Sequence, residues 1–88
     1  MESTKNFREF KINDFYQAVI LKTVGFPLLR LERGSGKFVV FVFDDPEYKA
    51  EEVLEKYWQR EIKVVARDLI ENIAELKTRL HCLPQLRI

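Results

Sequence analysis

The apolar residues of the chain are densest in one run, from Phe38 to Phe43, which is followed by the acidic pair Asp44-Asp45. Every residue of the run is β-branched or aromatic, and the run is as long as a strand, so the pattern predicts a β-strand. Side chains alternate between the two faces of a strand. One face therefore carries Phe38, Val40 and Val42, and the other carries Val39, Phe41 and Phe43. Because both faces are apolar, both must be covered, and we expect the other elements to surround this strand.

A hairpin partner is predicted just before this strand. The segment from Leu28 to Arg33 alternates roughly between apolar and polar residues, and Gly34 and Gly36 follow it, which favours a tight antiparallel reversal. Two strands alone are marginally stable. Helices must supply one cover for the hairpin, and the other must come from the termini or from a second subunit. The apolar tail residues Leu83, Leu86 and Ile88 are one candidate, as an edge strand.

Three helices are predicted from apolar residues that recur every three or four positions. The first begins at Asn13-Asp14, where either residue can cap it, runs to about Val24 before Gly25, and is apolar around much of its circumference. The second begins at Asp45-Pro46, with Pro46 in the first helical position. Its apolar stripe comprises Ala50, Val53, Leu54, Tyr57 and Trp58. The third runs from about residue 66 to Pro84.

The expected architecture is therefore one α+β domain over residues 1–88, in the order helix, antiparallel β-hairpin and two helices packed on the hairpin. We expect residues 1–9 to be flexible and residues 10–83 to form the core, with Phe10 and Ile12 docking onto it. Between residues 59 and 65 no Gly or Pro interrupts the pattern, so one long helix and a short extended link both fit.

Composition places the protein among small cytosolic domains. The chain has 88 residues, 47% of them hydrophobic and 33% charged, and its single cysteine, Cys82, cannot form an internal disulfide, which fits a reducing cytoplasm. No signal peptide and no membrane-spanning run is expected. Net charge is +1, yet residues 44–61 carry seven acidic and three basic residues, so the surface is not expected to be strongly basic.

The sequence offers three candidates for chemistry, and each has a simpler explanation. Gly34 to Lys37 lacks the spacing of a phosphate-binding loop and joins strand to strand. His81 and Cys82 point apart on a helix and have no further soft ligands to complete a metal site. Asp44 and Asp45 are explained by helix capping. We therefore expect no enzyme, with no catalytic residue, cofactor, metal ion or small-molecule substrate.

Two binding surfaces are predicted. If the helices cover only one face of the hairpin, an apolar interface remains, and its residues are Val39, Phe41, Phe43, Tyr57 and Trp58. Such an interface predicts protein contacts, with a homodimer as the expected form. The alternative is that these residues belong to an intramolecular core. A second hypothesis is binding of nucleic acid by a basic patch around the hairpin, formed by Lys22, Arg30, Arg33 and Lys37. The alternative there is an ordinary charged sheet edge that resists aggregation.

Several stretches carry a resemblance to a known family. They are Asp14 to Ala18, Gly25, Phe38 to Phe43, Tyr57 to Arg67 and Leu76-Lys77. Together they resemble a family of small, uncharacterised bacterial and phage-associated proteins classed as a domain of unknown function, over roughly residues 10 to 80.

The resemblance bears on the region between the last two helices. In that family Asn-Gly typically follows the Tyr-Trp pair and a polar cap precedes the last helix, whereas this chain has Gln59, Arg60 and Val65 at those places. The resemblance implies a break before Val65. It lends no activity, ligand or catalytic residue, and it implies a bacterial or mobile-element setting, which favours small adaptor and nucleic-acid-binding roles over metabolism.

Overall fold

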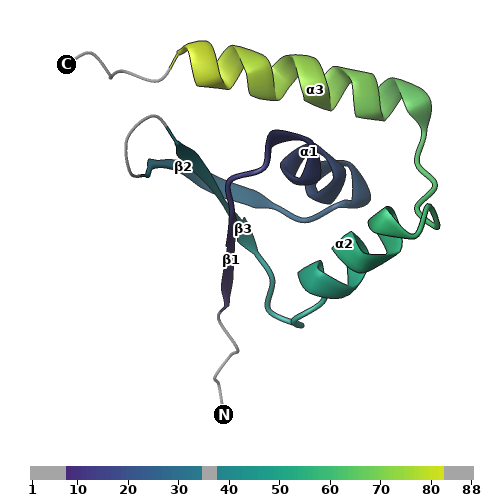
Figure 1. Cartoon of the computed structure of the whole chain (residues 1–88). Helices are drawn as coiled ribbons and strands as arrows, with labels where there is room; N and C mark the ends of the chain where they lie inside the picture. The colour runs from purple at the N-terminus through teal and green to yellow at the C-terminus, as the bar shows by residue number, and fades with distance from the viewer. Residues whose placement is uncertain (1–7, 35–37, 83–88) are drawn as a thin grey trace.

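The computed structural model describes residues 8–34 and 38–82, which form a three-stranded antiparallel sheet and three helices (Figure 1). In chain order the elements are β1 (Glu9–Ile12), α1 (Phe15–Val24), β2 (Leu28–Arg33), β3 (Val39–Asp44), α2 (Ala50–Trp58) and α3 (Ala66–His81). The predicted α+β class is confirmed, and so is the extended link between α2 and α3.

Strand β1 is an addition to the predicted fold, and it begins at Glu9, inside the segment expected to be flexible. The predicted turn at residues 35–37 and the tail residues Leu83, Leu86 and Ile88 lie outside the described residues.

The sheet has the order β1-β3-β2, so β3 is its central strand and pairs on both sides. On the β2 side Leu28 is opposite Phe43 and Arg30 is opposite Val42, which leaves Leu29 as an extra residue in a β-bulge. A bulge shifts the alternation of side chains by one position. Leu28 and Leu31 therefore share one face of the sheet although they are three residues apart.

Helix α1 lies at the middle of the molecule, with the sheet, α2 and α3 around it (Figure 1). Its four consecutive residues Ala18, Val19, Ile20 and Leu21 are all buried. Successive helix residues point about 100° apart, so four buried neighbours mean that the helix is covered on nearly every side. The expectation that α1 is buried around much of its circumference is confirmed.

The inner face of the sheet, the face toward α1, is part of one apolar core. Phe41 and Phe43 are 2% and 0% exposed, and they share a cluster with residues of all three helices, among them Leu21, Leu54 and Leu76. The ring centroids of Phe15 on α1 and Phe41 are 6.3 Å apart in an edge-to-face arrangement. The helices thus cover one face of the sheet.

The outer face of the sheet is covered by charged side chains instead. Val42 points outward on β3, yet it is 0% exposed. Arg30 on β2 donates two hydrogen bonds to Glu9 on β1, at 2.9 and 2.7 Å, and a third to Glu32 at 2.8 Å. Lys11 on β1 lies 3.5 Å from Glu32 on β2. Because β1 and β2 are about 10 Å apart with β3 between them, both pairs cross over β3 and lie above Val42.

These ion pairs shift the proton affinities of their members. The hydrogen bonds from Arg30 lower the pKa of Glu9 and of Glu32, since they stabilise the carboxylates. The same bonds raise the pKa of Arg30. The expectation that the termini or a second subunit cover the outer face is met in part for Val42: β1, near the N-terminus, supplies Glu9 and Lys11, and β2 supplies Arg30 and Glu32.

The start of α2 also differs from the prediction. Pro46 lies in a turn rather than in the first helical position, and the helix begins at Ala50. Asp45, 1% exposed, still caps the helix, because its carboxylate accepts hydrogen bonds from the backbone N–H of Lys49 at 2.8 Å and of Ala50 at 3.1 Å. Arg8 approaches the same carboxylate to 3.7 Å.

Helices α1 and α2 end in the same way. In each, a residue just past the helix has a positive φ: Gly25, directly after α1, has a φ of 125°, and Arg60, two residues after the end of α2, has a φ of 64°. Its N–H bonds to the carbonyl three residues earlier, and the next N–H bonds to the carbonyl five residues earlier, which is the Schellman pattern. Glycine adopts this conformation without strain, whereas arginine does so at a cost. Arg60 stands where the resemblance implies Gly, and its positive φ is one that Gly adopts more readily.

Candidate functional site

The first candidate surface is an exposed aromatic pair at the end of α2. Trp58 lies on the same helical stripe as Ala50 and Leu54, which are 0% and 8% exposed. Trp58 itself is 68% exposed, since α2 ends there and its last turn is not covered by the core. Its ring packs edge-to-face on Tyr57, with centroids 5.4 Å apart. An exposed tryptophan on a core-facing stripe is typical of a protein contact.

The five predicted interface residues are not on one surface. Val39, Phe41 and Phe43 belong to the inner face of the sheet, and the last two have almost no exposed area. Tyr57 is half-buried and Trp58 is exposed. Of the five, Trp58 therefore offers the most surface to a partner. The homodimer itself stays a prediction.

The three described residues of the predicted basic patch, Lys22, Arg30 and Arg33, are not brought together either. Lys22 is on α1 and lies 3.4 Å from Glu75 of α3. Arg30 is on the outer face of the sheet, bonded to two carboxylates. Arg33 is exposed at the end of β2, and Lys37 lies outside the described residues. The charges of Glu9, Lys11, Arg30 and Glu32 on the outer face sum to zero, so this face has no positive field for a polyanion.

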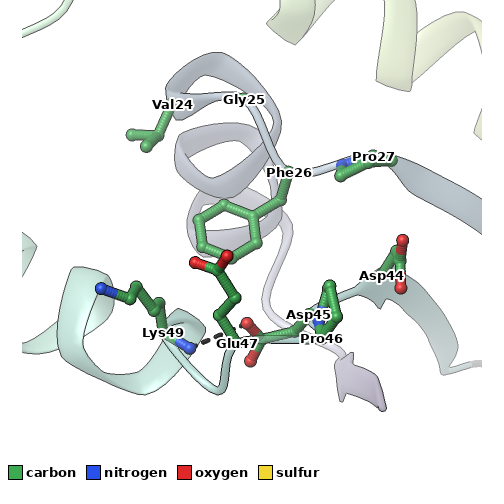
Figure 2. Close-up of a pocket in the computed structure, with 9 residues that line it drawn as sticks. All are labelled: Val24, Gly25, Phe26, Pro27, Asp44, Asp45, Pro46, Glu47 and Lys49. Carbon is green, nitrogen blue, oxygen red and sulfur yellow. Dashed lines mark hydrogen bonds between the residues drawn. The ribbon is translucent and has the colours of Figure 1, made fainter. Parts of the chain in front are cut away.

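The second candidate surface is an apolar cleft of about 270 Å³ (Figure 2). One wall is the end of α1 and the turn into β2, residues 24–27, and the other lies between Asp44 and Lys49. The backbone N–H of Asp44 donates to the carbonyl of Pro27 at 2.9 Å. This bond holds the two turns side by side and so forms the cleft.

The cleft combines an apolar floor with acidic side chains. Phe26 and Pro46 supply apolar surface, and Figure 2 shows the Glu47 side chain rising beside the Phe26 ring. Asp45 is fully engaged in capping α2. Asp44 and Glu47 make no ion pair with any residue in the ranges 8–34 and 38–82. The cleft therefore suits an apolar stem that ends in a positive charge.

From the sequence, the residues of both walls were expected only to mark the ends of helices. Gly25, Pro27 and Pro46 were expected to stop and start helices. The predicted antiparallel hairpin already places the start of β2 beside the end of β3, and the Asp44 to Pro27 hydrogen bond continues this pairing. The sequence did not indicate that a cleft forms between the two turns. The run of acidic residues from Asp44 to Glu47 was the one local signal for a site there.

The other residues considered for chemistry are apart from both surfaces. Cys82 is an exposed free thiol. The Nδ1 atom of His81 lies 3.0 Å from the carbonyl of Lys77, within the same helix. Among the residues that the structure describes, no group of three or more His, Cys, Asp or Glu is placed to hold a metal ion. None of the described helices is long and apolar enough to cross a membrane.

The chain was compared with known proteins at three levels. No curated protein matches it, and no solved structure matches it. One family model does match, and the match extends over residues 7–82 and so includes all six described elements. The chain therefore belongs to the family described as Domain of unknown function (DUF5659).

Proposed function

We propose that this protein is a non-enzymatic module that acts through protein contacts and forms a homodimer, with Trp58 at the contact. The observation that carries the proposal is that Trp58 stands on the core-facing stripe of α2 and is nevertheless 68% exposed. Tryptophan is the residue most enriched at the energetic centres of interfaces. A side chain that breaks the local burial rule in this way is best explained by a partner.

The conformation of Arg60 supports the same surface. Arg60 follows Trp58 by two residues and has a φ of 64°, where a residue other than glycine is strained by about 1 kcal/mol. Such strain is concentrated at functional positions. An arginine at a position whose φ favours glycine fits a side chain that contacts a partner, because Arg is enriched at interfaces.

A second copy of this chain suits the surroundings of Trp58. The neighbouring charged residues carry both signs, and they are Glu55, Lys56, Arg60, Glu61 and Lys63. In a two-fold interface each residue meets its counterpart's neighbours, so a patch of mixed sign can pair with itself. A patch of one sign would repel its own copy.

The test is the oligomeric state of the purified protein by sedimentation velocity at about 50 µM, a concentration at which a specific interface is occupied. We expect a dimer for the natural chain and a monomer for Trp58→Ala. Tyr16→Ala is the matched control, since Tyr16 is exposed to a similar extent, 56%, on another helix, and it should leave the dimer intact. A natural chain that is monomeric at this concentration would remove the proposal.

The Arg60→Gly variant distinguishes the effect of Arg60 on the free energy of unfolding from its effect on dimerisation. The change relieves the positive φ and should raise the free energy of unfolding by about 1 kcal/mol. If Arg60 contacts the second copy, the same variant should dimerise more weakly. A variant that is more stable and dimerises equally well would show that Arg60 takes no part in the contact.

The cytoplasmic location and the bacterial or phage setting implied by the resemblance are parts of this proposal. Nucleic-acid binding is not put forward as a second function, because the three described residues of the predicted basic patch are apart and two of them are paired with carboxylates. Fluorescence anisotropy with labelled DNA and RNA at low salt would test that hypothesis directly.

A further inference from the structure

We propose that the cleft between the end of α1 and the turn before α2 binds an arginine side chain presented by a basic segment of a partner protein. The proposal concerns a surface separate from Trp58 and does not depend on the homodimer. It is carried by the size of the cleft, its apolar floor, its acidic rim and the charge of the surface around it.

The size of the cleft indicates one side chain rather than a cofactor. Its volume of about 270 Å³ is below the range of about 300–1,000 Å³ in which drug-sized ligands bind. The cleft is open on one side, so a side chain can enter it while its own backbone stays outside. A partner's segment lying across the opening meets this requirement.

The chemistry of the walls selects a long cationic side chain. The ring of Phe26 and the ring of Pro46 give apolar surface for a methylene stem. Glu47 supplies a carboxylate beside the Phe26 ring, and Figure 2 shows the Asp44 carboxylate on the Pro27 side and the Lys49 side chain extending away from Glu47. Arginine fits better than lysine, because its guanidinium is weakly hydrated and stacks on aromatic faces.

The neighbouring turn already binds a guanidinium of this chain in the same manner. Arg8 lies over the ring of Tyr48, 4.5 Å from its centroid, and over Phe10 at 5.4 Å. It also approaches the carboxylates of Asp45 and Glu51, to 3.7 and 3.8 Å. This turn thus holds one arginine against rings and carboxylates, and the adjoining cleft offers the same kinds of group.

The surrounding charge favours a basic partner. Residues 44–61 carry seven acidic and three basic residues, and Glu51, Glu52 and Glu55 are exposed on α2. A field of this sign attracts a positively charged segment and speeds its association. The partner we infer therefore carries arginine within a basic stretch.

The experiment is a titration of the isotope-labelled protein with Nα-acetyl-arginine methylamide, followed by the amide shifts of Gly25, Glu47 and Lys49. We expect saturable shifts confined to the cleft, with a Kd on the order of 1 mM, as suits a ligand of this size. The citrulline analogue has the same shape without the charge and should bind at least threefold more weakly. Equal shifts from both probes, or none from arginine, would overturn the proposal.

Variants locate the site. Glu47→Gln should weaken binding of the arginine probe about three- to fivefold, as expected for an exposed ion pair. Glu71→Gln, an equally conservative change at an exposed position of α3 far along the chain from the cleft walls, should leave binding unchanged. Equal weakening by both would show a general effect of charge and would reject the site. Trp58→Ala should bind the probe normally, so loss of the dimer and loss of this site are separate results.

Discussion

The two faces of the sheet are buried by different means. On the inner face, Phe41 and Phe43 pack against the helices in an apolar core. On the outer face, Val42 is equally inaccessible to water, yet charged side chains of β1 and β2 cover it. Inner burial adds apolar contact area, whereas outer burial depends on the aliphatic stems of side chains that stay hydrated at their tips. A strand with two apolar faces therefore needs only one layer of helices.

The largest effect should come from opening the inner face. Phe41→Ala removes a buried ring and leaves a cavity, so we expect the free energy of unfolding in urea to fall by about 3–5 kcal/mol. A loss of that size can unfold a small domain. Phe41→Leu, expected to lose about 1–2 kcal/mol, keeps the test informative in that case. Phe38→Ala is the control, because Phe38 is 61% exposed and its loss should be within about 0.5 kcal/mol.

The next prediction tests whether the burial of Val42 on the outer face contributes to the free energy of unfolding. Val42→Ala removes two methyl groups from a residue that is 0% exposed, and we expect a loss of about 2 kcal/mol by urea unfolding. A loss as small as that of Phe38→Ala would mean that the charged cover leaves Val42 effectively hydrated. The comparison between the two faces would then fail.

A smaller effect distinguishes the stem of Arg30 from its charge. Arg30→Ala removes both, and we expect Tm to fall by a few degrees in thermal unfolding. Arg30→Met keeps an aliphatic stem above Val42 and should recover most of that fall, since exposed ion pairs contribute little. Lys77→Ala, at an exposed site on α3, should leave Tm unchanged. Equal Tm values for the Ala and Met variants would show that the charge of Arg30, and not its aliphatic stem, provides the stabilising cover over Val42.

The smallest effect is a dependence on pH that belongs to the outer face. In the folded protein the pKa of Glu9 and of Glu32 is lowered from 4.5, so their contribution to stability is present above that value and is lost as pH falls through the folded pKa values. We expect the free energy of unfolding of the natural chain, measured in urea, to fall between about pH 5 and pH 3. The free energy of unfolding of Arg30→Met should fall less over the same interval. Identical slopes would show that the ion pairs do not couple to folding.

Much of the fold could be predicted because local signals were strong. The apolar run of β3, the caps at Asp14 and Gly25 and the spacing of α3 each define an element without reference to distant residues. The start of α2 was wrong by four residues, because Asp45 caps the helix across a full turn and Pro46 lies within that turn. Helix propensity alone does not contain that geometry.

The sites could be predicted less well, because they depend on tertiary neighbours. Trp58 was identified as an interface residue from its aromatic character, but its stripe also contains Leu54, which is buried. Whether Leu54 or Trp58 is exposed depends on how far α2 extends beyond the core. Similarly, Lys22 and Arg30 are both basic, and the sequence does not indicate that Glu75 and Glu9 are their partners.

The position of β1 has a consequence for the order of folding. Among the described strands it pairs with β3 alone, and α1 and β2 lie between the two in the chain. During synthesis β1 leaves the ribosome first, but it has no strand to pair with until β3 has followed. Contacts between distant segments form late because of the entropy of closing the intervening loop. The first strand to be made should therefore be the last to join the sheet, and the ion pairs over Val42 should close with it.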